Sequence, residues 1–195
     1  MPKLLRWILF AGIPALLVVL LLFVFVRDAQ MPPAPVALPL TETFDDSPSG
    51  FTFQYPAEWR YTIPVRGVLL LGPPQTIFDG EAGPSLTVQR SDPLTVVGTL
   101  DEGLDRYLNL GPLRTQGLWQ ITQPVSTTTF NGRDARAVEL EGSNAEGTPR
   151  LFTRVVATVA DNSFVYLIIT STPAERRAAF EPTLNAILDT IQILE

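Results

Sequence analysis

The residues that could do chemistry in this chain of 195 residues are acidic, basic and aromatic, because it contains no cysteine and no histidine. Without cysteine the chain has no disulfides, thiolate nucleophiles or thiolate metal ligands. Without histidine it lacks the usual general base and the commonest metal ligand. A Ser-His-Asp or Cys-His mechanism is therefore excluded, and carboxylates are the groups left for catalysis or metal binding.

Two groups of carboxylates lie close together in the sequence. Asp101, Glu102 and Asp105 could offer oxygen ligands to calcium, but acidic residues also favour the first turn of a helix, and we expect that structural role. Asp45 and Asp46 precede proline and glycine and are expected to form a turn. No pair of carboxylates can be placed at the separation that glycoside hydrolysis requires. We therefore predict no catalytic residue, no metal site and no cofactor.

Side chains suited to recognition form a third group. Trp119 lies in a loop-like stretch before a predicted strand and is the aromatic residue that we expect at the surface, where tryptophan often anchors a partner. Arg60 and Arg66 could add bidentate contacts to an acidic partner, although charges also protect exposed strand edges. Trp59 is expected in the core. The predicted partner-binding residues are therefore Trp119, Arg60 and Arg66.

The segment that decides where these residues act is an apolar run at residues 7–26, flanked by Lys3, Arg6 and Arg27. About 20 helical residues cross a bilayer, and basic residues accumulate on its cytoplasmic side. We therefore expect residues 1–27 to be an uncleaved anchor with one transmembrane helix in the plasma membrane. The N-terminus would be cytoplasmic and the remainder of the chain extracytoplasmic. A cleaved signal peptide, which has a shorter apolar core, is the alternative.

Between the anchor and the domain, residues 28–49 are rich in proline and are predicted to be a semi-extended linker. Residues 50–195 leave room for one ordinary domain with a full core. The formal net charge is −6 at pH 7, which argues against nucleic acid as a partner, since phosphate binding needs a basic surface.

The pattern of the domain is that of an α+β fold. Alternating residues and turn signals predict extended segments over residues 51–55, 85–90, 121–130, 133–141, 151–160 and 164–170, and one more formed by residues 59–63 and 65–71 together. Asn131-Gly132 predicts a tight hairpin. Capping boxes at Thr99–Glu102 and Thr172–Glu175 predict the starts of two helices. We expect an antiparallel sheet of six or seven strands flanked by helices.

Several of these motifs together resemble a known family. The strand and turn GFTFQYPAEW at residues 50–59, the Asn-Gly-Arg hairpin at residues 131–133 and the final Ala-Ile-Leu-Asp-Thr-Ile at residues 186–191 are similar, in order, to PsbP-like domains. The resemblance covers residues 50–194 and implies a PsbP-like sandwich. Such domains occur as extrinsic subunits of photosystem II, as a nuclear-import factor that binds the small GTPase Ran, and as bacterial exported or membrane-anchored proteins. None of these implies an enzyme.

The sequence therefore predicts a membrane-anchored, extracytoplasmic, non-catalytic binding or accessory domain with a protein partner in the envelope. Two alternatives stay open. A carboxylate-dependent hydrolase of cell-envelope polymer would need a cleft that holds two carboxylates, one with a raised pKa. A structural subunit of an envelope complex would assemble through the transmembrane helix itself.

Overall fold

The structure of the protein is a computed structural model that describes residues 34–46, 50–110, 118–143, 148–161 and 163–194. Residues 35–195 form a compact unit that is distinct from residues 1–34. The predicted transmembrane segment at residues 7–26 lies outside the described residues, and none of the helices within them has the length and apolar character to cross a membrane.

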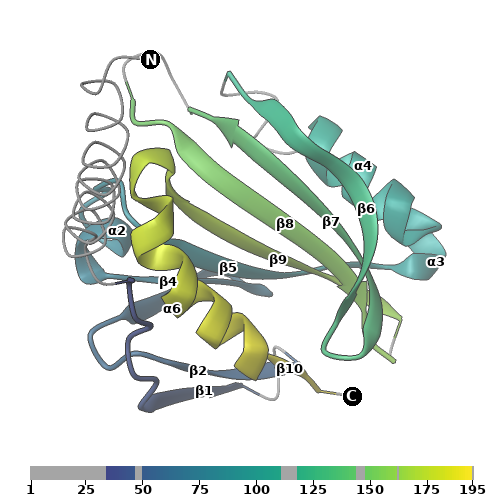
Figure 1. The fold of residues 1–195 in the computed structure, drawn as a ribbon. Helices are drawn as coiled ribbons and strands as arrows, with labels where there is room; N and C mark the ends of the chain where they lie inside the picture. Colours follow the sequence, from purple (N-terminus) through teal and green to yellow (C-terminus); the bar gives the residue numbers. More distant parts are fainter. Residues whose placement is uncertain (1–33, 47–49, 111–117, 144–147, 162, 195) are drawn as a thin grey trace, which may run out of the picture. The chain divides into compact units, whose positions relative to one another are not determined.

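A seven-stranded antiparallel sheet is the frame of the domain (Figure 1). Its strands follow the order β3-β4-β5-β9-β8-β7-β6. Their bounds are β3 (Arg60–Val65), β4 (Val68–Gly72), β5 (Ser85–Pro93), β6 (Gln120–Phe130), β7 (Arg133–Gly142), β8 (Leu151–Val159) and β9 (Phe164–Pro173). The predicted antiparallel sheet of six or seven strands is confirmed.

A second, three-stranded sheet has the order β1-β2-β10 and consists of β1 (Glu42–Asp46), β2 (Phe51–Tyr55) and β10 (Gln192–Ile193). The sequence assigned β1 to the linker over residues 28–49 and expected a turn at Asp45 and Asp46, but both residues belong to this strand. The reason is Phe44, which is only 5% exposed and stacks on Phe53 with ring centroids 5.1 Å apart. The folded domain therefore begins before residue 50.

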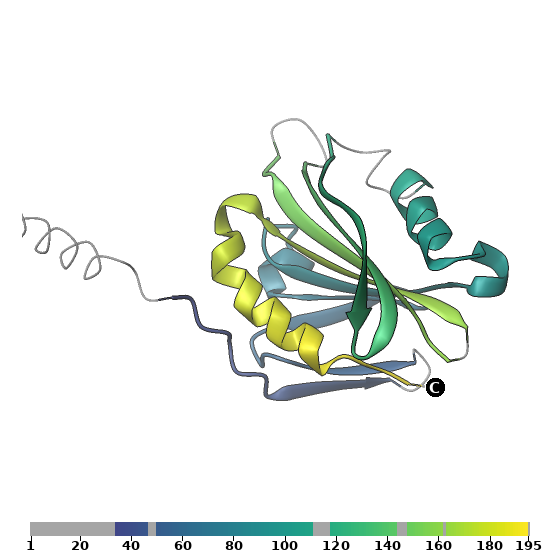
Figure 2. The same cartoon turned by 45° about the vertical axis from the view of Figure 1, so that its right-hand side comes forward.

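Helices cover both faces of the seven-stranded sheet (Figure 2). They are α2 (Pro74–Ile77), α3 (Leu94–Val97), α4 (Leu100–Leu110), the 3₁₀ turn η1 (Ala174–Arg176) and α6 (Arg177–Thr190). On one face, α6 and the small sheet enclose a core that includes Trp59, Leu71 and Ile187. On the other face, α3 and α4 enclose a second core around Leu104 and Val155. The result is an α+β sandwich.

Two local predictions are confirmed by backbone geometry and hydrogen bonds. The Thr99 N–H donates to Glu102 Oε2 at 2.8 Å, and the Glu102 N–H donates to Thr99 Oγ1 at 3.2 Å, as a capping box requires. Asn131 and Gly132 have φ values of 50° and 79°, which suit the tight hairpin between β6 and β7.

The second predicted capping box is wrong. Thr172 lies within β9, where it pairs with Phe152 of β8, and no side chain of the described residues caps the helical turn after Pro173. The cause is the strand pairing, which continues to Pro173 opposite Leu151 and holds the backbone of Thr172 extended. The Thr172 side chain therefore belongs to a strand of the sheet and does not cap the helix.

Candidate binding surface

The acidic residues of α4 have structural partners. Asp101 accepts from Arg136 Nε at 2.9 Å, Glu102 belongs to the capping box, and Asp105 Oδ1 accepts from Asn109 Nδ2 at 2.6 Å. Within the described part of the chain, no three metal-ligating side chains form a group that could hold an ion. The structural role expected for these carboxylates therefore agrees with their contacts.

The structure places the three predicted partner-binding residues on two different edges of the sheet. Arg60 begins β3 and Arg66 follows its last residue, whereas Trp119 directly precedes β6. Since β3 and β6 are the outermost of seven strands, they lie roughly 30 Å apart at about 4.8 Å per strand. These residues therefore do not form one contiguous site, and the contribution of each to partner binding stays a prediction.

The surroundings of these residues differ as well. Arg60 donates from Nη1 to the carbonyl groups of Ala57 and Trp59, both at 2.7 Å, whereas Arg66 is exposed in a turn. Trp119 is half-buried against the core beneath α4, and its buried Nε1 has no hydrogen-bond partner among the residues that the structure describes. Trp59 is 2% exposed, which confirms its expected place in the core.

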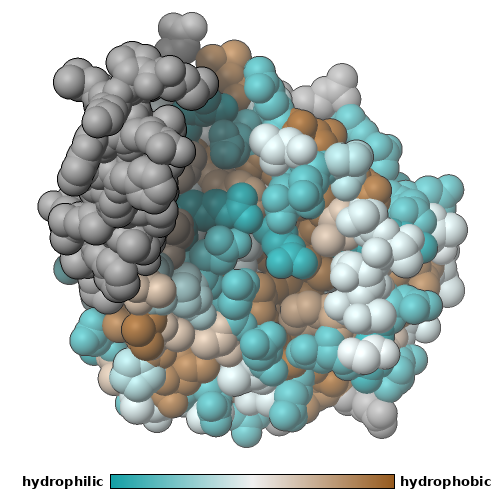
Figure 3. Space-filling view, in the orientation of Figure 1, coloured by the Kyte–Doolittle hydropathy of each residue, from teal (hydrophilic) through white to brown (hydrophobic). Residues whose placement is uncertain are grey.

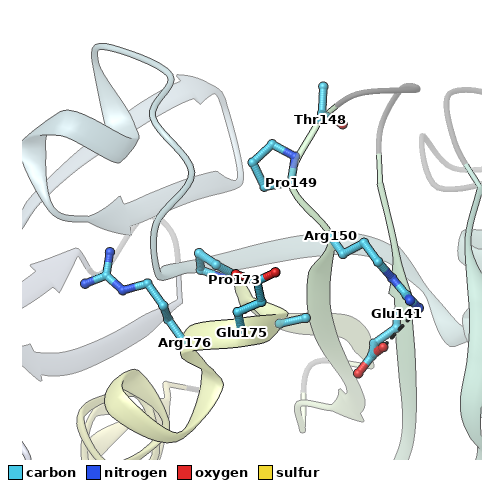
Figure 4. Close-up of a pocket in the computed structure, with 8 residues that line it drawn as sticks. Glu141, Thr148, Pro149, Arg150, Pro173, Glu175 and Arg176 are labelled. Carbon is cyan, nitrogen blue, oxygen red and sulfur yellow. Dashed lines mark hydrogen bonds and ion pairs between the residues drawn. The ribbon is translucent and has the colours of Figure 1, made fainter.

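A hollow of about 620 Å³ opens where β7 ends, β8 begins and β9 leads into η1 and α6 (Figure 4). It is lined by Glu141, Thr148, Pro149, Arg150, Pro173, Ala174, Glu175 and Arg176. The Ala174 N–H donates to the Arg150 carbonyl oxygen at 2.9 Å, which ties the start of β8 to the start of the helical segment. The hollow therefore lies where residues at the ends of β7, β8 and β9 meet.

The charged side chains of this hollow point in different directions. Arg150 Nη2 reaches Glu141 Oε2 at 3.1 Å, whereas Arg176 extends to the opposite side (Figure 4). The Arg176 guanidinium lies over the Phe180 ring at 4.6 Å from its centroid. An arginine thus lies on each side of the hollow, and Glu175 lies between them.

A narrow slot of about 20 Å³ continues along the same strands, between the sheet and α6. Its walls are Phe152, Arg154, Thr170, Thr172, Arg177, Glu181, Leu184 and Asn185. The Arg177 guanidinium lies 3.5 Å from the centroid of the Phe152 ring, and its Nη2 donates to Glu181 Oε1 at 3.0 Å. Stacking and ion pairing therefore fix one wall of the slot.

We call Arg150, Arg154, Arg176 and Arg177 the arginine cluster. Arg150 directly precedes β8 and Arg154 lies within it, whereas Arg176 ends η1 and Arg177 begins α6. The antiparallel pairing of β8 with β9 places the two segments side by side. Figure 3 shows hydrophilic side chains gathered over β8 beside α6. The sequence analysis missed this cluster because the pairs are separated along the chain and their register was unknown.

Comparison with known proteins identifies the fold. No family model matches the chain, and no curated protein is similar to it in sequence. Solved structures do match. The cyanobacterial PsbP (CyanoP) of Synechocystis is 14% identical with a TM-score of 0.55, over 85% of this chain and 99% of that one. The Ran-binding protein Mog1p of Saccharomyces cerevisiae is 11% identical with a TM-score of 0.54, over 80% and 97% of the two chains.

LpqN of Mycobacterium tuberculosis, described as involved in cell envelope biogenesis, is 16% identical with a TM-score of 0.50, over 88% of this chain and 95% of that one. At such identities the likeness establishes the fold and not the function. The domain therefore has a PsbP/Mog1-like fold, which confirms the fold that the sequence motifs predicted.

Proposed function

We propose that this chain is a non-catalytic binding or accessory protein, held in the plasma membrane by residues 7–26, whose extracytoplasmic domain docks a protein partner at the arginine cluster. The observation that carries this proposal is the cluster itself, which surrounds a hollow and a slot on hydrogen-bonded strands. Support for the anchor and for the location comes from the apolar run and its basic flanks.

The chemistry of the cluster favours recognition over catalysis. Arginine presents a planar fork of donors that pairs with carboxylates and stacks on aromatic rings. The stacking of Arg176 on Phe180 restricts this side chain before a partner arrives, so less conformational entropy is lost on binding. The cluster is therefore suited to an acidic partner surface.

The carboxylates beside the cluster do not favour the hydrolase alternative. Glu141 is ion-paired with Arg150, and Glu181 is ion-paired with Arg177. Both carboxylates are therefore already engaged by guanidinium groups. Two of the fold neighbours are described as a Ran-binding protein and as a protein involved in cell envelope biogenesis, which is consistent with a binding role.

A photo-crosslinking experiment tests this proposal in the membrane. Amine-directed reagents are unsuitable because the only lysine is Lys3, so a photo-reactive amino acid is placed at Glu175, which lines the hollow. The matched control places it at Val96, which is 58% exposed on α3. We expect a protein adduct from position 175 that excess soluble domain (residues 35–195) displaces, and none from position 96.

Other results would contradict this proposal or favour the hydrolase. An adduct that the soluble domain does not displace, or equal adducts from both positions, would contradict docking at the arginine cluster. Hydrolysis of envelope polymer by the purified protein, lost on Glu141→Gln, would support the hydrolase instead.

A further inference from the structure

The second half of β6 is a sheet edge without the usual protection against strand pairing. Edge strands are normally protected by charged side chains, prolines or bulges. The opposite edge strand, β3, begins with Arg60 and contains Pro64 and a register irregularity. Strand β6 contains no charged residue, and its proline and its register irregularities all lie before Ser126. Residues 126–130 are therefore regular, uncharged and outermost in the sheet (Figure 1).

The hairpin between β6 and β7 determines which backbone groups of β6 face outward. The two-residue loop Asn131-Gly132 has positive φ at both positions, and such a loop joins its flanking residues as a hydrogen-bonded pair. Hydrogen-bonded and non-hydrogen-bonded pairs then alternate along an antiparallel ladder. Thr127 and Thr129 fall in non-hydrogen-bonded pairs with β7, so their N–H and C=O groups point away from it. No turn or loop backbone group of the described residues bonds to them.

The hydrogen bond to Asp134 agrees with this alternation. Asp134 lies opposite Thr129 on β7, and its carbonyl oxygen accepts from Thr158 Oγ1 of β8 at 2.9 Å. This C=O group therefore faces β8 and not β6, as a non-hydrogen-bonded pair requires. Thr127 and Thr129 thus present a short row of donors and acceptors along the free edge of β6.

We propose that this edge pairs with the same edge of a second copy of the chain. When two copies lie antiparallel about a twofold axis at Thr128, Thr127 of each copy lies opposite Thr129 of the other. Their outward backbone groups then form about four hydrogen bonds, and the threonine side chains meet on one face of the sheet.

The charge of the molecule also favours this edge for a contact between copies. A second copy has the same formal net charge of −6, so a self-contact is favourable only where few like charges meet. Strand β6 brings none. The spacing of Thr127 and Thr129 makes the row of backbone groups complementary to itself, which selects a second copy over an unrelated strand.

Disulfide trapping tests the pairing in the full-length protein, because the native chain has no cysteine. The Thr128→Cys variant is produced in membranes and oxidised with copper phenanthroline. Thr128 would face its own copy in a non-hydrogen-bonded pair, with Cα atoms about 4.5 Å apart and within reach of a disulfide. We therefore expect a covalent dimer. Thr62→Cys is the matched control and should stay monomeric, since Thr62 is also a half-buried threonine of an outermost strand.

Mixed variants test the register. Thr127→Cys alone and Thr129→Cys alone should give little dimer, since equivalent residues would be diagonal neighbours about 7–8 Å apart, beyond the usual reach of a disulfide. Production of both variants together should give the mixed dimer, because these two positions lie opposite each other.

A proline variant tests the backbone contribution. Thr127→Pro removes an N–H group that faces outward, so it should leave the pairing of β6 with β7 in place. Added to Thr128→Cys, it should abolish the covalent dimer. Hydrogen exchange of the β7 amides shows whether the fold is retained.

Four results would overturn the inference: no dimer from Thr128→Cys, as much dimer from Thr62→Cys, a mixed pair that gives no more dimer than its single variants, or a dimer that survives Thr127→Pro. An adduct of Thr128→Cys with a different protein in place of a second copy would also overturn it. Failure to find a protein partner at the arginine cluster would contradict only the proposed function, because the pairing of β6 needs no such partner.

Discussion

Replacing Thr172 by valine should stabilise the domain. Within the described part of the chain the Thr172 hydroxyl is buried without a hydrogen-bond partner, and such a group costs about 1–3 kcal/mol of folding free energy. Valine has the same shape and replaces the hydroxyl by a methyl group, which gains about 0.8 kcal/mol on burial. A water molecule in the slot would recover part of the original cost, so we expect the free energy of unfolding to rise by about 1–2 kcal/mol.

Urea unfolding of residues 35–195 measures this change, and the thermal midpoint should rise by about 2–4 °C per kcal/mol for a domain of this size. Thr158→Val is the matched control, because Thr158 is also buried and the variant removes the existing hydrogen bond from Thr158 Oγ1 to the Asp134 carbonyl oxygen. It should lower the free energy of unfolding by about 1 kcal/mol. If both variants lost stability equally, the Thr172 hydroxyl would have a partner in the folded protein and the reasoning would be refuted.

Three further predictions concern the helix start, a tight turn and the anchor. Thr99→Ala removes one half of the capping box and should lower the free energy of unfolding by about 1 kcal/mol, measured by urea unfolding. Gly50→Ala should cost more stability than Gly80→Ala: both glycines have positive φ, but an added Cβ clashes with the Tyr166 hydroxyl only at Gly50. Exchanging residues 7–26 for an unrelated apolar span should preserve partner capture, whereas loss of capture would favour assembly through the transmembrane helix.

The parts of the fold that could be predicted from the sequence are those determined by neighbouring residues. The Asn131-Gly132 hairpin depends on two adjacent residues that accept positive φ, and the capping box depends on Thr99 and Glu102, three residues apart. Strand β2 shows a clear alternation, with Phe51, Phe53 and Tyr55 buried. In each case a few residues close together in the sequence are enough to determine the element.

What could not be predicted depends on contacts that are distant in sequence. Strand β1 has one large buried residue, Phe44, and is stabilised by pairing with β2, so its own pattern did not distinguish it from the linker. Thr172 matched a capping box, but pairing with β8 extended the strand past it. The arginine cluster depends on the register between β8 and β9, which no motif encodes. Predictions from local patterns therefore located the elements and missed the surface that they form together.

The central claim is that the arginine cluster docks a partner, and displacement of the adduct formed at position 175 tests it most directly. Wild-type soluble domain is compared as competitor with two double variants, Arg150→Gln/Arg176→Gln in the cluster and Arg90→Gln/Arg106→Gln outside it; Arg90 stacks on Phe164 much as Arg176 stacks on Phe180. We predict that the concentration for half displacement rises at least tenfold for the cluster variant and stays within twofold for the other. Equal displacement by both variants and the wild type would contradict the claim.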